Sequence, residues 1–296
     1  MHEIKNFFIF IVMALFFFVL SFSIPFMGVF FLPLAAVFIT FLFIKNGHLL
    51  GVLGTIILFW VIYKFIPNGN VFCFVFPLFV MLNSLFLYYG ITKKKHCWRI
   101  ILDSCIAISS VFSITVLSFV INGSHTEWIT KISSNFPKDI PDAIYKVVTD
   151  NIYSVIIIFI IISVVLSYIF LSSLSKRFNI NIEKIQSFGY WRLPEKFIFA
   201  FIFSLLMHVV SKQIKSAVLL QISGNMLNVI FFLYFIGGLS IGKHFFGKSK
   251  VLLLVSYVFF LFYSPSAVFL GVSDVWFNFR KKREDEKNEG HLNARD

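Results

Sequence analysis

Three side-chain amides lie about one helical turn apart in the apolar run 217–241 of this 296-residue chain. Gln221, Asn225 and Asn228 are spaced i, i+4, i+7, so they share one face of a helix. A carboxamide both donates and accepts hydrogen bonds, which suits an uncharged or zwitterionic solute. Amides also join helices within membrane bundles, at about 0.6 kcal/mol per contact. The spacing therefore predicts either a solute-binding face or a packing contact, and it favours neither.

A fourth amide, Asn83, lies beside Ser84 in the apolar run 71–91, after Pro77. Polar groups inside a spanning helix are costly unless they face protein, water or a ligand, which makes them the first places to look for function. A single Asn is more often a hydrogen-bonded contact between helices than a ligand-binding group. Asn83 is therefore a second candidate for solute binding, with helix packing as the commoner role.

The end of the last apolar run combines a carboxylate, an indole and a guanidinium. Asp274 follows an apolar stretch of more than twenty residues. Trp276 comes two residues after Asp274, and Arg280 six residues after it. Trp and Arg are typical of the headgroup boundary, which places Asp274 at that depth. A carboxylate there is expected to pair with a basic residue, so these three residues are candidates for a structural or coupling role.

Two spacings predict local contacts. Asp103 follows Arg99 by four residues, which places the two charges on one helix face as an ion pair. Gly238 and Gly242 have the small-x-x-x-small spacing that allows two membrane helices to approach closely.

The sequence offers no catalytic constellation within its apolar runs. Intramembrane enzymes need groups such as Ser with His, two Asp, or H-E-x-x-H, and none of these patterns occurs there. The chain also lacks a Walker-type phosphate loop. Cys73, Cys97 and Cys105 show no C-x-x-C spacing, so we expect small buried apolar residues rather than a metal site. We therefore expect a protein that is not an enzyme and holds no cofactor.

The composition requires a solvent other than water. Hydrophobic residues make up 58% of the chain and charged residues 14%, against roughly 45–50% and 25% in soluble domains. The excess apolar surface predicts a lipid bilayer as the surrounding medium. The net charge of +12 lies mostly at the ends of apolar runs. Such charges set topology and meet lipid headgroups, so nucleic acid is not an expected partner.

Nine apolar runs predict an all-α, polytopic transmembrane helix bundle. The runs are 7–21, 25–44, 49–66, 71–91, 100–121, 153–174, 197–210, 217–241 and 251–272. A spanning helix needs about 20 apolar residues, and the run 197–210 is too short unless flanking residues help. We therefore expect about eight spans, with 197–210 re-entrant or interfacial.

Basic residues support the count of eight. They gather at 93–99, at 176–196 and at 280–295. With eight spans all three clusters face the cytoplasm, whereas nine spans would place the last cluster opposite the other two. We predict cytoplasmic termini, one integral membrane domain at 1–279, and a basic, disordered cytoplasmic tail at 280–296. The connection 122–151 contains short amphipathic pieces and is either a lid over an outward-facing cavity or an ordinary interfacial loop.

Several segments together resemble a known family. They are residues 190–194 (YWRLP), Asn225 to Asn228, residues 234–240 (YFIGGLS) and residues 270–280 (LGVSDVWFNFR). Over roughly residues 188–282 the chain is similar to the YybS-like family of predicted bacterial multi-pass membrane proteins of unknown function. That family is grouped distantly with the S components of energy-coupling-factor transporters, which capture vitamins or metal-related solutes and pass them to an ATP-driven module.

The resemblance implies a solute-capture role in the bacterial cytoplasmic membrane. An ATP-driven transport module or other membrane proteins would then be partners. We expect a small-solute-binding or permease component in which Gln221, Asn225 and Asn228, with Asn83, line a cavity. The alternative is a non-transporting membrane scaffold or assembly factor that organises partners through its basic tail and close-packed glycines.

Overall fold

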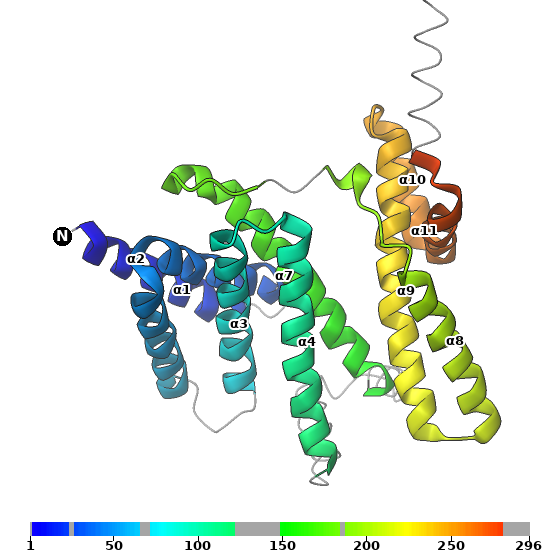
Figure 1. The fold of residues 1–296 in the computed structure, drawn as a ribbon, viewed down its shortest axis with the longest axis horizontal. Coiled ribbons are helices and arrows are strands. Elements are labelled where there is room, and N and C mark those ends of the chain that lie inside the picture. The colour runs from blue at the N-terminus through cyan, green and yellow to red at the C-terminus, as the bar shows by residue number, and fades with distance from the viewer. Residues whose placement is uncertain (1, 24–26, 66–71, 122–148, 184–186, 281–296) are drawn as a thin grey trace, which may run out of the picture. The chain divides into compact units, whose positions relative to one another are not determined.

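The computed structural model describes residues 2–23, 27–65, 72–121, 149–183 and 187–280, and every regular element in these ranges is helical (Figure 1). The predicted all-α membrane bundle is confirmed. By their internal contacts the residues form two compact units. The first comprises Met1–Phe136 and Phe159–Ile185, and the second comprises Pro137–Ile158 and Gln186–Asp296.

The first unit is built around helix α2 (Gly28–Phe65), which Gly47 divides into two legs. Gly47 has φ 83° and ψ 172°, a backbone conformation that glycine adopts at no steric cost. The legs correspond to the predicted runs 25–44 and 49–66. Every residue from 35 to 43 is buried, so the first leg is enclosed on all sides. It is the core of this unit, and α2 packs against α1 (His2–Ser23) and α3 (Phe72–Thr92).

The remaining elements of the first unit are α4 (Cys97–Ile121), most of α7 (Ile152–Leu174), and the short 3-10 helix η2 (Ser175–Phe178). Phe178 of η2 packs between Phe10 and Phe41, with ring centroids 5.2 and 4.7 Å away. Stacked and edge contacts of this kind add about 0.5–1.5 kcal/mol per pair beyond the burial of area. They hold the end of α7 against α1 and α2.

The second unit contains η3 (Phe188–Tyr190), α8 (Phe197–Ile214), α9 (Ala217–Phe246), α10 (Lys250–Phe262) and α11 (Ser264–Phe277). Helices α8 and α9 form an antiparallel hairpin (Figure 1). Lys215 turns the chain with a left-handed backbone, and the Ser216 hydroxyl then caps α9 by accepting from the Leu219 N–H. Helix α9 is the centre of the unit, because α8, α10, α11 and η3 all pack against it.

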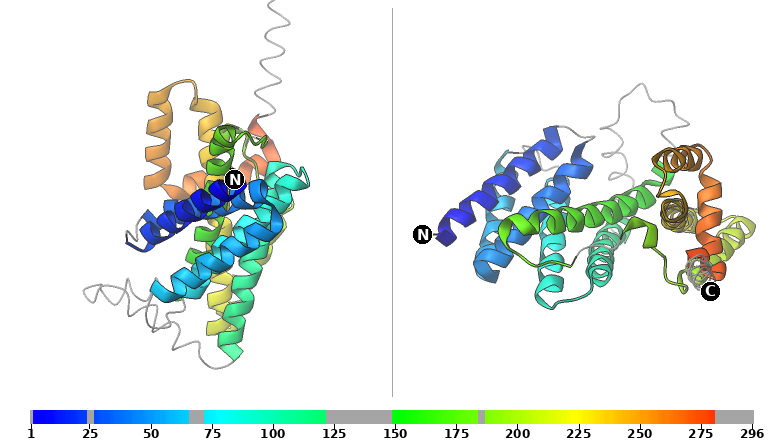
Figure 2. Two further views of the ribbon diagram at one scale, coloured as in Figure 1. Left: turned by 90° about the vertical axis from the view of Figure 1, so that its left-hand side faces the viewer. Right: turned by 90° about the horizontal axis from the view of Figure 1, so that it is seen from above.

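The last apolar run, predicted as one segment at 251–272, is divided into two helices. Helices α10 and α11 meet at Tyr263 with a bend of 106°, and Figure 2 shows the sharp corner from two sides. Pro265 lies at the start of α11, where its missing N–H is harmless. Within a continuous helix its ring would clash with the carbonyl of Leu261. The Ser-Pro-Ser sequence at 264–266 therefore ends one helix and begins the next.

Helix α8 corrects a second prediction. It runs for 18 residues, past the predicted limit at Val210, and is long and apolar enough to cross a membrane. The segment that is bent at a break between two short helices is α10–α11, whereas α8 is one candidate span. Within the described ranges five helices meet the criteria for a span, or six if α10–α11 is counted as one. Shorter apolar helices occur at Asn6–Ser21 and Phe76–Thr92.

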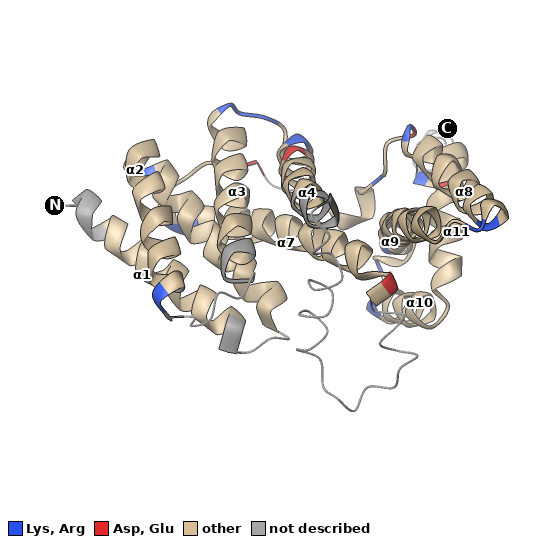
Figure 3. Ribbon diagram, turned by 90° about the horizontal axis from the view of Figure 1, so that it is seen from below, with Lys and Arg blue, Asp and Glu red and all other residues tan. Residues whose placement is uncertain are grey.

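Charged residues avoid the middle of the helices. In the described part of the chain, Lys and Arg lie at helix ends, in connections, and beside the Gly47 kink (Figure 3). This placement is typical of bilayer proteins, where basic side chains reach the headgroups. The predicted tail from residue 281 onward and the connection 122–148 lie outside the described residues.

Candidate functional site

The second unit contains a buried charge cluster at the end of α11, here called the Asp274 junction. Asp274 is 2% exposed and Arg280 is 7% exposed. One Asp274 carboxylate oxygen, Oδ2, lies 3.5 Å from Arg280 Nη2 and 3.8 Å from Arg192 Nε. The other, Oδ1, accepts a hydrogen bond of 3.1 Å from the Phe279 N–H. The carboxylate is thus shared by two guanidinium groups and one backbone amide.

Backbone carbonyls complete the junction and tie three segments together. Arg280 donates from Nη1 to the Trp191 carbonyl at 2.6 Å. The Ser240 hydroxyl lies within hydrogen-bond distance of the Phe188 and Trp191 carbonyls, at 2.6 and 2.9 Å. The connection before α8, the end of α9 and the end of α11 therefore meet at one end of the second unit. Trp276, predicted beside Asp274, is 64% exposed and faces outward.

The electrostatics of the junction are governed by burial. Burial lowers the pKa of Arg280 from its ordinary value, while Asp274 raises it and Arg192 lowers it further. Arg192 also contacts Glu195 Oε1 at 3.5 Å. The cluster therefore contains two carboxylates and two guanidinium groups, so its formal charges balance. A buried carboxylate without these partners would be strongly destabilising. The contacts present are those of a structural ion pair, and a coupling role for Asp274 and Arg280 stays a prediction.

The junction determines the path of α10 and α11. With 13 and 14 residues, these helices are about 20 and 21 Å long, too short to cross about 30 Å of hydrocarbon. The end of α11 contacts Trp191 and Arg192, and Trp191 contacts Ser240 near the end of α9. The end of α11 therefore lies beside the end of α9.

Two glycines allow α11 to cross α9 in backbone contact. A Cβ at Gly238 would overlap the Ala267 carbonyl, and a Cβ at Gly271 would overlap the Tyr234 carbonyl. Gly242 lies against the Phe260 ring of α10. The predicted role of Gly238 and Gly242 in close helix packing is confirmed.

The amide row of α9 lies against the beginning of α7. Asn225 is 6% exposed; its Oδ1 accepts from the Ser154 N–H at 2.7 Å, and its Nδ2 donates to the Asp150 carbonyl at 2.8 Å. Asn228 Nδ2 donates to Asn151 Oδ1 at 2.6 Å. Gln221 is half-buried, and its backbone carbonyl accepts from Asn225 Nδ2, while its side chain makes no hydrogen bond with the part of the chain that the structure describes. Two of the three amides thus make packing contacts, and solute binding by the row stays a prediction.

Asn83 lies fully buried in the first unit. Its Nδ2 donates to Ser167 Oγ on α7 at 2.8 Å, while its Oδ1 has no hydrogen-bond partner among the described residues. Beside it the Ser84 hydroxyl contacts the Ala36 carbonyl of α2 at 2.9 Å. Asn83 therefore joins α3 to α7 and retains one unused acceptor.

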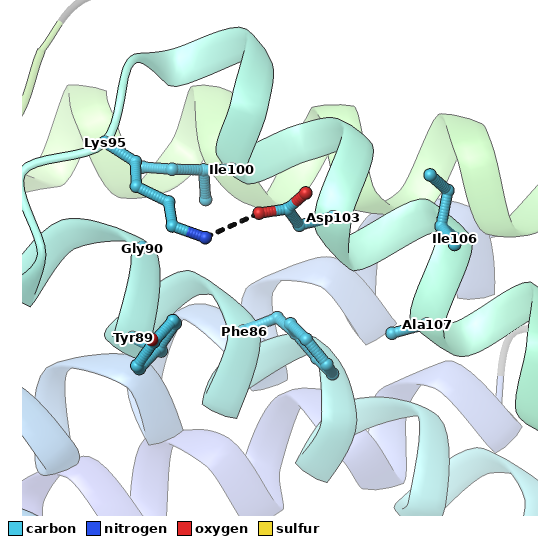
Figure 4. Close-up of a pocket in the computed structure, with 8 residues that line it drawn as sticks. All are labelled: Phe86, Tyr89, Gly90, Lys95, Ile100, Asp103, Ile106 and Ala107. Atoms are coloured by element: carbon cyan, nitrogen blue, oxygen red, sulfur yellow. Dashed lines mark hydrogen bonds and ion pairs between the residues drawn. The ribbon is translucent and has the colours of Figure 1, made fainter.

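A charged pocket of about 250 Å³ lies between α3 and α4 and is here called the α3–α4 pocket (Figure 4). Lys95 Nζ lies 2.7 Å from Asp103 Oδ2 and 5.1 Å from the centre of the Tyr89 ring. Arg99 Nε lies 3.0 Å from Asp103 Oδ1, which confirms the predicted pair. The other lining residues are Phe86, Gly90, Ile100, Ile106 and Ala107. The role of Lys95 was missed, because it lies before the helix and outside the i, i+4 pattern.

His96, Cys97 and Glu183 offer ligand atoms within 4.8 Å of one another. Imidazole, thiolate and carboxylate are the groups that zinc binds. The contacts present, however, are a cap on α4: Glu183 Oε2 accepts from the Cys97 N–H at 2.9 Å, and Oε1 lies 3.1 Å from His96 Nε2. Sequence reasoning missed this group because Glu183 is 86 residues from Cys97.

Comparison with known proteins supports the membrane assignment. Residues 133–275 match a family described as a predicted membrane protein, DUF2232, a domain of unknown function. The matching region includes α8, α9, α10 and Asp274, and it ends before Trp276 and Arg280. No curated protein and no solved structure matches the chain.

Proposed function

We propose that the protein is a small-solute-binding or permease component of a membrane, with the broken pair α10–α11 lining its solute path. The observation that supports this proposal is the 106° bend at Tyr263. Broken helices at membrane depth are tolerated where they are buried in protein or line a water-filled cavity. In secondary transporters such discontinuous helices form the substrate site.

The apex of the pair has backbone groups that lipid cannot satisfy. At a helix end the last carbonyls and the first N–H groups lack the partners of the regular helical pattern. Here the Tyr263 N–H donates to the Phe259 carbonyl and the Ser266 N–H to the Tyr263 carbonyl, which satisfies some of these groups and not all. Phe262 and Tyr263 are 90% and 58% exposed, and Ser264 and Pro265 are exposed beside them. Hydrocarbon offers no hydrogen bonds, so water, solute or protein must cover this apex.

The resemblance to the YybS-like family and, distantly, to S components supports the same class of function. S components capture small solutes and pass them to an ATP-driven module, and such a module is the partner that we propose. The scaffold alternative depends on the basic tail, which lies outside the described residues from 281 onward. The close-packed glycines of that alternative make contacts within one unit of this chain, between α9 and α11, rather than with a partner.

Cysteine accessibility tests whether the apex faces water. Ser264→Cys and Ser266→Cys would be introduced after replacing Cys73, Cys97 and Cys105 with Ser, and membranes would be treated with a small hydrophilic thiosulfonate. We expect labelling at both positions. Val258→Cys, on the apolar surface of α10, is the matched control that stays unlabelled, and Lys248→Cys is the labelled control. An unlabelled apex beside a labelled Lys248→Cys would contradict the proposal.

A solute screen tests the function itself. Purified protein would be heated with a library of vitamins and other small solutes, because a ligand at about 100 times its dissociation constant adds about 2.7 kcal/mol of stability. Gln221→Ala is the informative variant, since its side chain makes no hydrogen bond within the described residues. Loss of the ligand-induced shift in this variant would assign Gln221 to binding. Absence of any stabilising solute, in wild-type protein that unfolds cooperatively, would count against solute capture.

A further inference from the structure

The α3–α4 pocket combines an excess of positive charge with an apolar wall. We propose that it binds the phosphate of an anionic glycerophospholipid, with Lys95 and Arg99 facing the phosphate and the first part of an acyl chain lying beside Phe86, Ile106 and Ala107. This site is independent of the solute path proposed for α10–α11, because its residues all belong to the first unit.

The charge balance leaves donors available for an anion. Lys95 and Arg99 both contact Asp103, and Lys93 and Lys94 lie in the turn just before them. The other carboxylate at this end, Glu183, contacts His96 and the Cys97 N–H. An ammonium group has three N–H donors and a guanidinium has five, and one carboxylate cannot use them all. Lys95 lines the pocket and its side chain is 31% exposed. The Arg99 side chain lies outside the lining, contacts Asp103 of the pocket and is 67% exposed.

The pocket is polar at one end and apolar at the other. In Figure 4 Lys95 and Asp103 lie near the turn between the helices, and Ile106 and Ala107 lie farther along α4. Tyr89 and Phe86 follow the same direction on α3. This order matches a lipid that enters with its headgroup at the helix ends and its chain toward the centre of the bilayer. A free phosphate ion would leave the apolar wall unused.

The size and position of the pocket agree with a lipid headgroup. A volume of about 250 Å³ is below the roughly 300–1,000 Å³ of sites that enclose whole small molecules. It accommodates a phosphoglycerol group and the first methylenes, with the rest of the chain on the protein surface. The His96–Glu183 contact brings the connection after α7 to the same end of α4. Basic clusters such as that at 93–99 face anionic lipid.

The test uses the full-length protein purified in a mild, uncharged detergent. Thermal stability would be followed while phosphatidylglycerol, phosphatidylcholine, or glycerol phosphate is added. We expect stabilisation by phosphatidylglycerol, little by phosphatidylcholine, and none by glycerol phosphate at equal concentration. Equal stabilisation by glycerol phosphate would overturn the lipid as the source of the phosphate. Equal stabilisation by phosphatidylcholine would overturn recognition of negative charge.

Charge variants separate the pocket from the general attraction of a basic surface. Lys95→Gln should raise the phosphatidylglycerol concentration at half-effect about fivefold, as expected for about 1 kcal/mol per basic residue at an anionic surface. Lys94→Gln removes the same charge from the same turn but lies outside the pocket lining, so its effect should be smaller. Equal shifts in the two variants would show a diffuse surface effect and overturn the proposal.

Two further variants change the pocket without removing a basic residue. Asp103→Asn releases Lys95 and Arg99 from their carboxylate, so it should tighten phosphatidylglycerol binding even though it removes an ion pair. Ala107→Trp fills the apolar end and should weaken binding with no change in charge. Weaker binding in Asp103→Asn, or unchanged binding in a folded Ala107→Trp protein, would contradict the proposed site.

Discussion

Two aspartates of this protein, Asp103 and Asp274, are each shared by two basic side chains, yet the two clusters differ in burial. The Asp103 side chain is 21% exposed and its partners Lys95 and Arg99 are 31% and 67% exposed. The Asp274 side chain is 4% exposed, and its partner Arg280 is 8% exposed. The same set of charges is therefore accessible to a ligand in the first unit and closed in the second.

The origin of the partners explains the difference. Lys95 and Arg99 lie within eight residues of Asp103. These contacts therefore stabilise the beginning of α4 but join no segments that are distant in the sequence. Arg192 lies 82 residues before Asp274 in the sequence and approaches it only when α8, α9 and α11 have assembled. A local pair at the surface leaves donors free, whereas a distant pair inside the protein uses them to join segments.

The largest expected effect is the loss of the buried carboxylate. Asp274→Asn leaves Arg280 buried without its counter-charge, and breaking a buried pair costs about 3–5 kcal/mol. We expect the lower end of that range, because the Arg192 side chain is 29% exposed and keeps some solvent. The measurement is the free energy of unfolding in mixed micelles, followed by circular dichroism. Asp103→Asn is the matched control, and an exposed pair is worth about 0.2–1 kcal/mol. Equal losses in the two variants would remove the contrast between the clusters.

The second effect concerns the helix crossing that brings Asp274 into place. Gly271→Ala puts a methyl group into the Tyr234 carbonyl, so α11 must move away from α9. Overpacking of this kind costs about 1–3 kcal/mol, measured by the same unfolding experiment. Gly224→Ala on α9 is the control, since no atom lies within 4 Å of its Cβ position. A destabilised Gly224→Ala protein beside an unchanged Gly271→Ala protein would show that the crossing is misplaced.

The third effect separates packing from binding in the amide row. Asn225→Ala removes hydrogen bonds to Ser154 and Asp150, and we expect a loss of about 1 kcal/mol, within the range for interhelical polar contacts. Gln221→Ala should leave the unfolding free energy unchanged, because its side chain makes no such contact in the described ranges. If thermal denaturation shows the reverse order, the row has a different orientation from the one described.

The smallest effect is the response to salt. Exposed charges are screened at high ionic strength, so the small penalty of Asp103→Asn should fall by a few tenths of a kcal/mol when salt is raised to about 1 M. The penalty of Asp274→Asn should stay nearly constant, because buried pairs are screened much less. Unfolding measured at two salt concentrations for both variants gives the result directly. A penalty that falls equally in both would indicate that water reaches Asp274.

Local patterns in the sequence predict much of this architecture. The apolar runs correspond to helices, the Arg99–Asp103 pair follows from spacing alone, and Gly238 marks a close crossing. The break at Tyr263 was missed because hydropathy does not register a Ser-Pro-Ser sequence inside an apolar run. The contact between Glu183 and Cys97, and those of Arg192 with Asp274, depend on tertiary assembly across more than 80 residues, which no local period encodes.

The return of α11 to the end of α9 has a consequence for how the protein is made. The machinery that inserts nascent chains into the membrane recognises segments by their hydrophobicity. By that measure Lys250–Phe277 is a single apolar segment. Neither half is long enough to be recognised as a crossing by itself. Hydrophobicity alone therefore does not specify the bend between the two helices. The bend also depends on the packing of α11 against α9, where Gly238 and Gly271 allow the two backbones to approach closely.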